Sequence, residues 1–132
     1  MPSSWLRNHA STSPDAASPK LRGRAYGIPF ARVWEAVLAT AEARPRWTVT
    51  GTDPRRGEVT AEARTILWRF VDDVTIRVSL DDHGLTRVDL ASASRLRGYD
   101  WGVNARRIAR FLHALDRRLR RDGAAREPAS KR

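Results

Sequence analysis

The feature that most constrains this chain is a pair of alternating polar and apolar stretches, residues 73–80 and 86–91, separated by the turn Asp81–Gly84. Alternation with a period of two places the two sets of side chains on opposite faces of a β-strand. The two stretches therefore predict a β-hairpin with one apolar face. That face consists of Val74, Ile76, Val78 and Leu80 in the first strand and Thr86, Val88 and Leu90 in the second.

The requirement that both apolar sets lie on the same side of the sheet determines the pairing register of this hairpin. A slip of one residue would turn every side chain of one strand to the opposite face. Pairing Leu80 with Thr86 meets the requirement, and the same register places Asp72 opposite Ser94. The core-facing side is therefore predicted to include Asp72, Ser92 and Ser94, and the opposite side Asp73, Ala93 and Arg95.

The other patterned segments predict one more hairpin, an edge strand and two helices. Apolar residues with helical spacing indicate a helix over Phe30–Arg44, and a second helix is expected to begin near Asp100, a favourable N-cap residue. Further strands are expected over residues 21–28, 46–52 and 58–64. The order β-α-β-β-β-β-α predicts an α+β fold, with an antiparallel sheet of about four to five strands and two helices packed on one face. This arrangement resembles a TATA-binding-protein-like or small helix-grip fold.

The length of 132 residues suits one compact domain with short extensions. We expect a flexible N-terminal segment at residues 1–20, a single α+β domain at residues 21–121, and a disordered basic tail at residues 122–132. No apolar run is long enough for a signal peptide or a membrane span, so we expect a cytoplasmic protein. The absence of cysteine excludes disulfides and thiolate chemistry.

The formal net charge is +10, and most of the excess lies in the last helix and the tail. Arginine-rich surfaces bind phosphate groups well, so an acidic partner or a nucleic acid is one hypothesis. A solvated helix face and an arginine-rich genomic composition are the plainer interpretations of the same residues. The candidate polyanion-binding set on the last helix is Arg106, Arg110, Arg117, Arg118 and Arg121.

Several short motifs occur together in a recognisable order. They are Ala61–Arg64 (AEAR), Phe70–Val74 (FVDDV), Ser92–Arg95 (SASR) and Asp100–Asn104 (DWGVN) followed by Arg107-Ile108, with Pro45–Trp47 and Asn8–Thr12 upstream. In order and spacing this chain resembles domain-of-unknown-function family 1499 over residues 7–121. The resemblance implies a bacterial or plastid-related protein and no established biochemical activity.

The chain departs from the family pattern at three positions. His9 stands where the family has a cysteine, so no lipid anchor and no thiol role is carried over. Ala91 replaces an arginine before the SASR motif, and Gly98 lies one place later than the usual glycine.

The resemblance and the register together select a polar set that is either a binding site or a structural network. Asp72 and Asp73 could act as a metal site or as acid and base, but they point to opposite faces of a regular strand. In the structural interpretation, Asp72 accepts a hydrogen bond from Ser94, and Asp73 pairs with Arg64 or Arg95. Asp100 and Asn104 anchor the start of the last helix. The candidate binding set is Arg64, Asp72, Asp73, Ser92, Ser94, Arg95, Asp100, Asn104 and Arg107.

No catalytic motif is recognisable in the chain, and His9, His83 and His113 lack metal-ligand spacing. We therefore assign no catalytic residues, metal or cofactor, and the leading hypothesis is a non-enzymatic binding or scaffold domain. Polyanion binding through the last helix is the first alternative. The second is a small-ligand-binding or hydrolase-like helix-grip protein that uses Asp72, Arg64 and Asn104.

Overall fold

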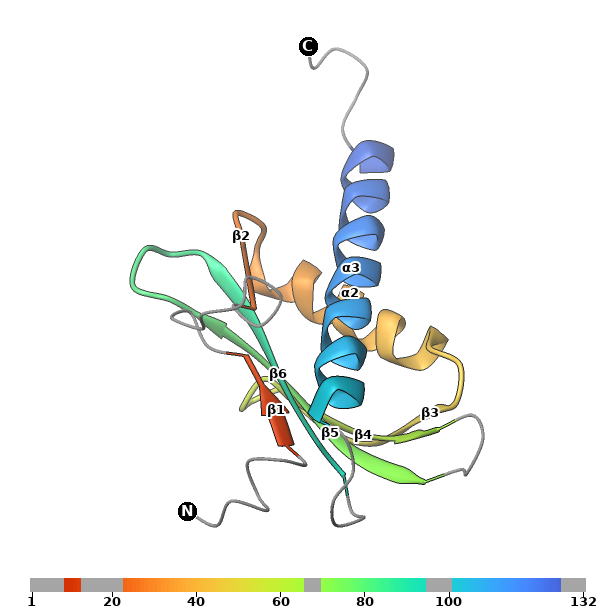
Figure 1. The fold of residues 1–132 in the computed structure, drawn as a ribbon. Coiled ribbons are helices and arrows are strands. Elements are labelled where there is room, and N and C mark those ends of the chain that lie inside the picture. Colours follow the sequence, from red (N-terminus) through yellow and green to blue (C-terminus); the bar gives the residue numbers. More distant parts are fainter. Residues whose placement is uncertain (1–8, 13–22, 66–69, 95–100, 127–132) are drawn as a thin grey trace.

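A computed structural model describes residues 9–12, 23–65, 70–94 and 101–126 (Figure 1). The described residues form a sheet with two helices on one face, which confirms the predicted α+β class. In chain order the elements are β1 (His9–Ser11), β2 (Arg24–Tyr26), α2 (Phe30–Ala43), β3 (Trp47–Asp53), β4 (Glu58–Arg64), β5 (Val71–Leu80), β6 (Thr86–Ser94) and α3 (Trp101–Arg126).

The sheet is antiparallel and its strand order is β1-β6-β5-β4-β3, with β2 also paired to β6. From β2 to α3 the predicted order β-α-β-β-β-β-α is confirmed. Consecutive strands from β3 to β6 are neighbours, because each follows the preceding strand within a few residues of the chain. In the resulting meander, one edge of β6 pairs with the two short strands β1 and β2.

The pairing of β5 with β6 follows the register predicted from the apolar pattern. Leu80 lies opposite Thr86, Ile76 opposite Leu90, and Asp72 opposite Ser94. Along β5 the inward side chains from Asp72 to Val78 are buried and the outward ones are partly or fully exposed. Leu80, at the end of the inward row, is exposed. Strict alternation in both strands therefore identified the inward face correctly, including its polar end.

The structure contains a strand that the sequence analysis did not predict. β1 lies within the segment that was expected to be flexible, and it pairs with residues 91–93 of β6. Thr12 secures the connection, because its N–H donates to the Leu90 carbonyl at 2.8 Å and its hydroxyl accepts from the Leu90 N–H at 3.0 Å. α3 also continues to Arg126, beyond the predicted domain end at residue 121. The proposed division into segments therefore does not coincide with the element ends.

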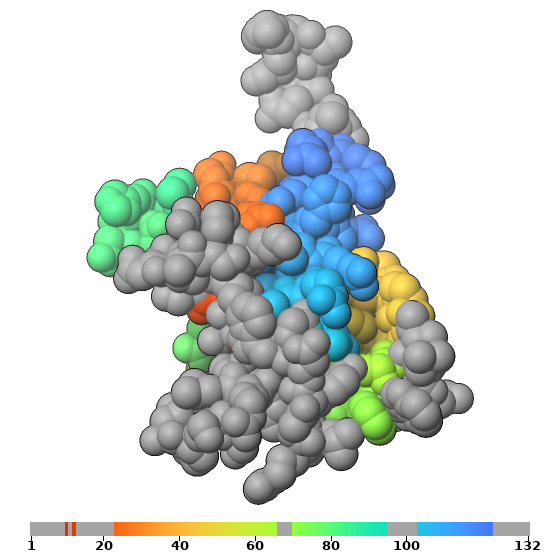
Figure 2. All heavy atoms as spheres, viewed as in Figure 1, coloured from red at the N-terminus to blue at the C-terminus, as the bar shows by residue number. Residues whose placement is uncertain are grey.

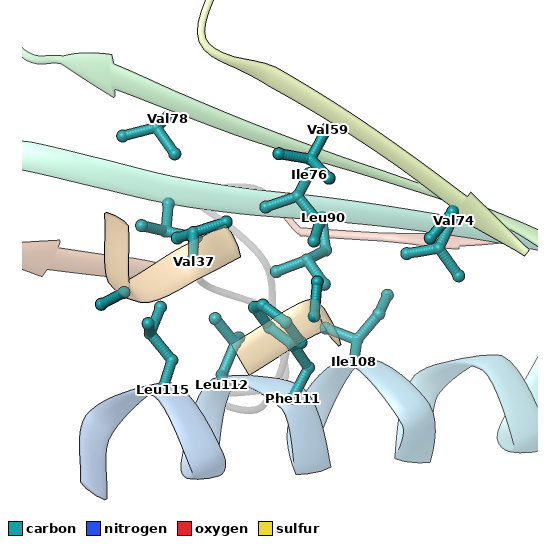
Figure 3. Close-up of a cluster of buried hydrophobic side chains, with 14 of the residues drawn as sticks. Val37, Val59, Val74, Ile76, Val78, Leu90, Ile108, Phe111, Leu112 and Leu115 are labelled. Atoms are coloured by element: carbon teal, nitrogen blue, oxygen red, sulfur yellow. The ribbon is translucent and has the colours of Figure 1, made fainter. Parts of the chain in front are cut away.

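The hydrophobic core lies between the inner face of the sheet and the two helices (Figure 3). Phe111 is fully buried, and its ring stacks on that of Trp47 with centroids 5.4 Å apart. Burial of each large apolar side chain contributes about 1.5–3 kcal/mol relative to exposure. The labelled side chains in Figure 3 project from β4, β5, β6, α2 and α3 toward one another, so the core fastens α3 across the sheet.

Hydrogen bonds to Asp116 connect β2 to α3. The Arg24 Nε donates to both oxygens of Asp116 at 2.9 and 3.1 Å, and the Tyr26 hydroxyl donates to the same carboxylate at 2.6 Å. Burial and the Asp116 charge raise the pKa of Tyr26 above its ordinary value. The phenol therefore stays protonated and remains a hydrogen-bond donor.

Candidate functional site

A buried polar network connects the inner face of the sheet to the beginning of α3. Asp72 on β5 and Ser92 and Ser94 on β6 face inward because the period of two places them in line with the core residues of those strands. Asn104 and Arg107 are three residues apart, so they share the face of α3 that covers the sheet. Asp72, Ser92 and Asn104 are fully buried, and Ser94 is 7% exposed.

Asn104 is the centre of the hydrogen-bonded part of this network. Its amide group accepts from the Ser92 hydroxyl at 2.6 Å and donates to the Ser94 hydroxyl at 2.9 Å. Arg107 Nη1 donates to the Asn104 carbonyl oxygen at 3.0 Å and to the Ser92 hydroxyl at 3.2 Å. One amide therefore bridges two positions of β6, and one guanidinium supports the bridge.

Asp72 forms an ion pair with Arg107, with 2.7 Å between Oδ2 and Nη1. Both N–H groups of Nη1 are directed to Ser92 and Asn104. The 2.7 Å approach is an ion pair, and Ser94, which lies opposite Asp72 in the register, also lowers the pKa of this carboxyl through a side-chain hydrogen bond. Burial raises the pKa of Asp72, and the Arg107 charge partly offsets this increase. Hence Asp72 is a costly buried charge that depends on Arg107.

Two further members of the predicted set, Arg64 and Asp73, are exposed and lie apart from this buried network. Arg64 is exposed on β4, with its Nη2 3.8 Å from Glu62 Oε1. Asp73 is exposed on the outer face, opposite Glu62 on one side and Ala93 on the other. Arg95 and Asp100 lie outside the described residues. A binding role for the set stays a prediction.

The sequence analysis identified Ser94 as a partner of Asp72 but missed Arg107, which forms the ion pair. Arg107 comes from a helix that crosses the sheet, and strand register carries no information about that crossing. One signal was present: Asn104 lies four residues before Ile108, at the start of the apolar stripe. A polar residue at a core position of a helix indicates a buried hydrogen-bonding partner. The predicted stripe instead began at Val103, which is only partly buried.

The arginines of α3 separate into two groups. Arg118 is partly buried, and its Nε donates to the Thr40 hydroxyl of α2 at 3.1 Å. The exposed members are Arg106, Arg110, Arg117, Arg120 and Arg121. Within the described segments none of these exposed arginines forms an ion pair. Arg118 therefore serves helix packing, and Arg120, absent from the predicted polyanion set, belongs with the exposed group.

A small cleft of about 170 Å³ lies between α2 and α3, with Arg32, Glu35, Arg118 and Asp122 among its lining residues. It is smaller than the roughly 300–1,000 Å³ typical of ligand pockets. None of the buried network residues lines it.

Across residues 9–12, 23–65, 70–94 and 101–126, no cluster of three or more His, Cys, Asp or Glu side chains has a metal-binding arrangement. In the same part of the chain, no helix combines the length and apolar character needed to span a membrane.

Comparison with known proteins identifies the family of this chain. A search among curated proteins found no match. The model of the family described as "Protein of unknown function (DUF1499)" matches residues 6–115, which include all the strands and most of α3. The match confirms the resemblance drawn from the FVDD, SASR and DWGVN motifs. The chain belongs to the DUF1499 family.

Proposed function

We propose that this protein is a non-enzymatic binding domain in which the Asp72 network is structural. The observation that carries this proposal is the complete burial of Asp72 beside Arg107. A general acid or base must come within hydrogen-bonding distance of its substrate. Asp72 and Ser92 are both fully buried, and the nearest cation is committed to them. The network is therefore better suited to stabilising the contact between α3 and the sheet than to catalysing a reaction.

This proposal is tested by separating folding from binding. Native mass spectrometry of the full chain, after incubation with metabolite, lipid and nucleotide pools, should recover a bound species of unchanged mass. The variant Asp72→Asn should keep that binding wherever it remains folded, because its side chain does not contact the ligand. Conversion of any component of the pools by the purified protein, with loss of conversion in Asp72→Asn, would contradict the proposal.

The exposed arginines of α3 favour polyanion binding as the second candidate. Arg106, Arg110, Arg117 and Arg121 follow one another at intervals of four, seven and four residues, so they fall on one face of the helix. At 1.5 Å per residue this arginine stripe is about 22 Å long. Figure 2 shows the blue side chains of α3 at the surface of the molecule. A linear row of unpaired cations suits a linear array of phosphates.

Salt-dependent binding tests the polyanion candidate. Fluorescence anisotropy with labelled single-stranded and duplex oligonucleotides should give an affinity that falls steeply as salt rises. Replacement of Arg117 and Arg121 by glutamine should weaken binding and reduce the salt slope by about one per lost contact. The matched control replaces Arg55 and Arg56, two exposed arginines of the β3–β4 turn. Equal weakening by both pairs would contradict a specific role for the stripe.

A further inference from the structure

Arg44 and Arg46 flank Pro45 at the junction between α2 and β3, a segment called the corner below. The Arg44 N–H donates to the Ala41 carbonyl at 3.3 Å and ends α2, and the Arg44 carbonyl accepts from Trp47 N–H at 3.3 Å. The Arg46 carbonyl accepts from Arg64 N–H at 3.0 Å. The backbone of this corner is therefore tied to its own helix and to β4.

The same corner lies against α3 close to Arg110. Trp47, next to the corner, stacks on Phe111, and Arg110 is the residue before Phe111. In Figure 2 the yellow surface of the α2–β3 junction adjoins the blue surface of α3. Burial lowers the pKa of Arg44, and the positive charges of Arg110 and Arg46 lower it further. Two elements distant in sequence thus bring three like charges together.

These three charges are not neutralised by the part of the protein that the structure describes. No ion pair joins Arg44, Arg46 or Arg110 to an acidic side chain among the described residues. The Nε atom of Arg44 is buried there without a hydrogen-bond acceptor. A buried donor without an acceptor costs about 1–3 kcal/mol. A bound anion beside Arg46 and Arg110, which are exposed, would reduce this repulsion.

Arg46 adds backbone strain to this electrostatic cost. Its φ of 65° is in the left-handed region, and among described non-glycine residues it alone has a positive φ. That conformation costs an L-residue roughly 1–2 kcal/mol, and glycine would avoid most of the cost. Strained residues of this kind are concentrated at binding and catalytic sites. Charge repulsion, an unsatisfied donor and strain therefore coincide at one corner.

We propose that Arg44, Arg46 and Arg110 form a binding site for a phosphate-class oxyanion. Guanidinium groups match the geometry of tetrahedral oxyanions and bind them through paired hydrogen bonds. The proposal names a ligand class for the binding function proposed above and rests on that function. It differs from polyanion binding along the arginine stripe, with which it shares only Arg110.

The direct test is titration of the full chain with inorganic phosphate and pyrophosphate at low ionic strength, followed by NMR or calorimetry. We expect saturable binding at one site, with the largest shifts at residues 44–47 and 110. Arg44→Gln and Arg110→Gln should each weaken binding by at least about tenfold, the effect of losing one charge-assisted hydrogen bond. Arg46→Gly should weaken it as well without loss of folding, because glycine accepts the positive φ.

The matched control is Arg55→Gln, an exposed arginine of the β3–β4 turn, which should change the affinity less than twofold. A loss as large as that of Arg44→Gln would show general charge attraction and overturn the site. Absence of saturable phosphate or pyrophosphate binding would also overturn it. If oligonucleotide binding through the stripe then persisted, the polyanion function would stand without this site.

Vesicles distinguish free phosphate from phosphate carried by a lipid. Phosphatidic acid vesicles, compared with phosphatidylcholine vesicles, should bind the protein only if the site accepts a lipid phosphate. If phosphatidic acid vesicles do bind the protein, the Arg44→Gln variant must bind them less than the original chain does. Vesicle binding that Arg44→Gln leaves unchanged would contradict the assignment of these residues.

Discussion

Asp72 on β5 and Arg107 on α3 form an ion pair, with the carboxylate fully buried and the guanidinium side chain 12% exposed. This contact joins the central strands of the sheet to the helix that covers them. Asn104 and Ser92 share the same guanidinium nitrogen. Removal of either side chain leaves its partner in a poorly solvated position, so the pair should matter chiefly for folding.

Asp72→Ala should lower the free energy of unfolding by about 3 kcal/mol, because it leaves the Arg107 charge without its partner. Asp73→Ala is the matched control, since Asp73 is adjacent in sequence and exposed on the opposite face. That variant should cost less than about 1 kcal/mol. Urea denaturation followed by circular dichroism measures both. Equal costs, or a larger cost for Asp73→Ala, would mean that the register does not determine the roles of these carboxylates.

The raised pKa of Asp72 predicts a pH dependence of stability with a definite sign. Its folded pKa lies above the ordinary value of 3.8, so the folded protein holds this proton more tightly than the unfolded chain. Protonation therefore favours folding, and this contribution decreases as pH rises from 3.8 through the folded pKa. The stability advantage of the original chain over Asp72→Asn should be larger at pH 4 than at pH 7. Urea melts at both values check it, and the opposite trend would show that Arg107 overcomes the effect of burial.

Asn104→Ala should destabilise the protein by about 2–4 kcal/mol, because Ser92 and Ser94 lose their shared partner and a cavity replaces the amide. His113→Ala, on the exposed face of the same helix, should change stability by no more than about 0.5 kcal/mol. Thermal or urea melts of the two variants give the comparison. A small cost for Asn104→Ala would imply that the serines find other partners.

Arg46→Gly should stabilise the unliganded protein by about 0.5–1 kcal/mol, since glycine adopts the positive φ with little strain. Arg55→Gly, at an exposed turn position without a positive φ, should give no such gain. Differential scanning calorimetry in phosphate-free buffer measures both variants. Destabilisation by Arg46→Gly would show that the arginine side chain contributes packing that outweighs the strain.

The strand register and the inward direction of Asp72 could be predicted because they depend on local alternation. Asp72 opposite Ser94 followed from keeping two apolar faces on one side of the sheet. The helix and strand order followed from periodicity and from the prolines around α2 for the same reason.

The contacts that depend on three-dimensional packing could not be predicted. The pair of Asp72 with Arg107 depends on where α3 crosses the sheet, and the grouping of Arg44 with Arg110 depends on the stacking of Trp47 on Phe111. β1 is only three residues long, too short for a recognisable alternation. Its pairing is supported by Thr12, a single side chain that bonds to β6.

A double-mutant cycle between Asp72 and Arg107 tests the structural role of the network most directly. The free energies of unfolding of the original chain, Asp72→Ala, Arg107→Ala and the double variant are measured by urea denaturation. We predict a coupling energy of at least about 1 kcal/mol, with the double variant less destabilised than the sum of the single variants. Additivity within about 0.5 kcal/mol would contradict this role, because it would show that the two side chains do not depend on each other for folding.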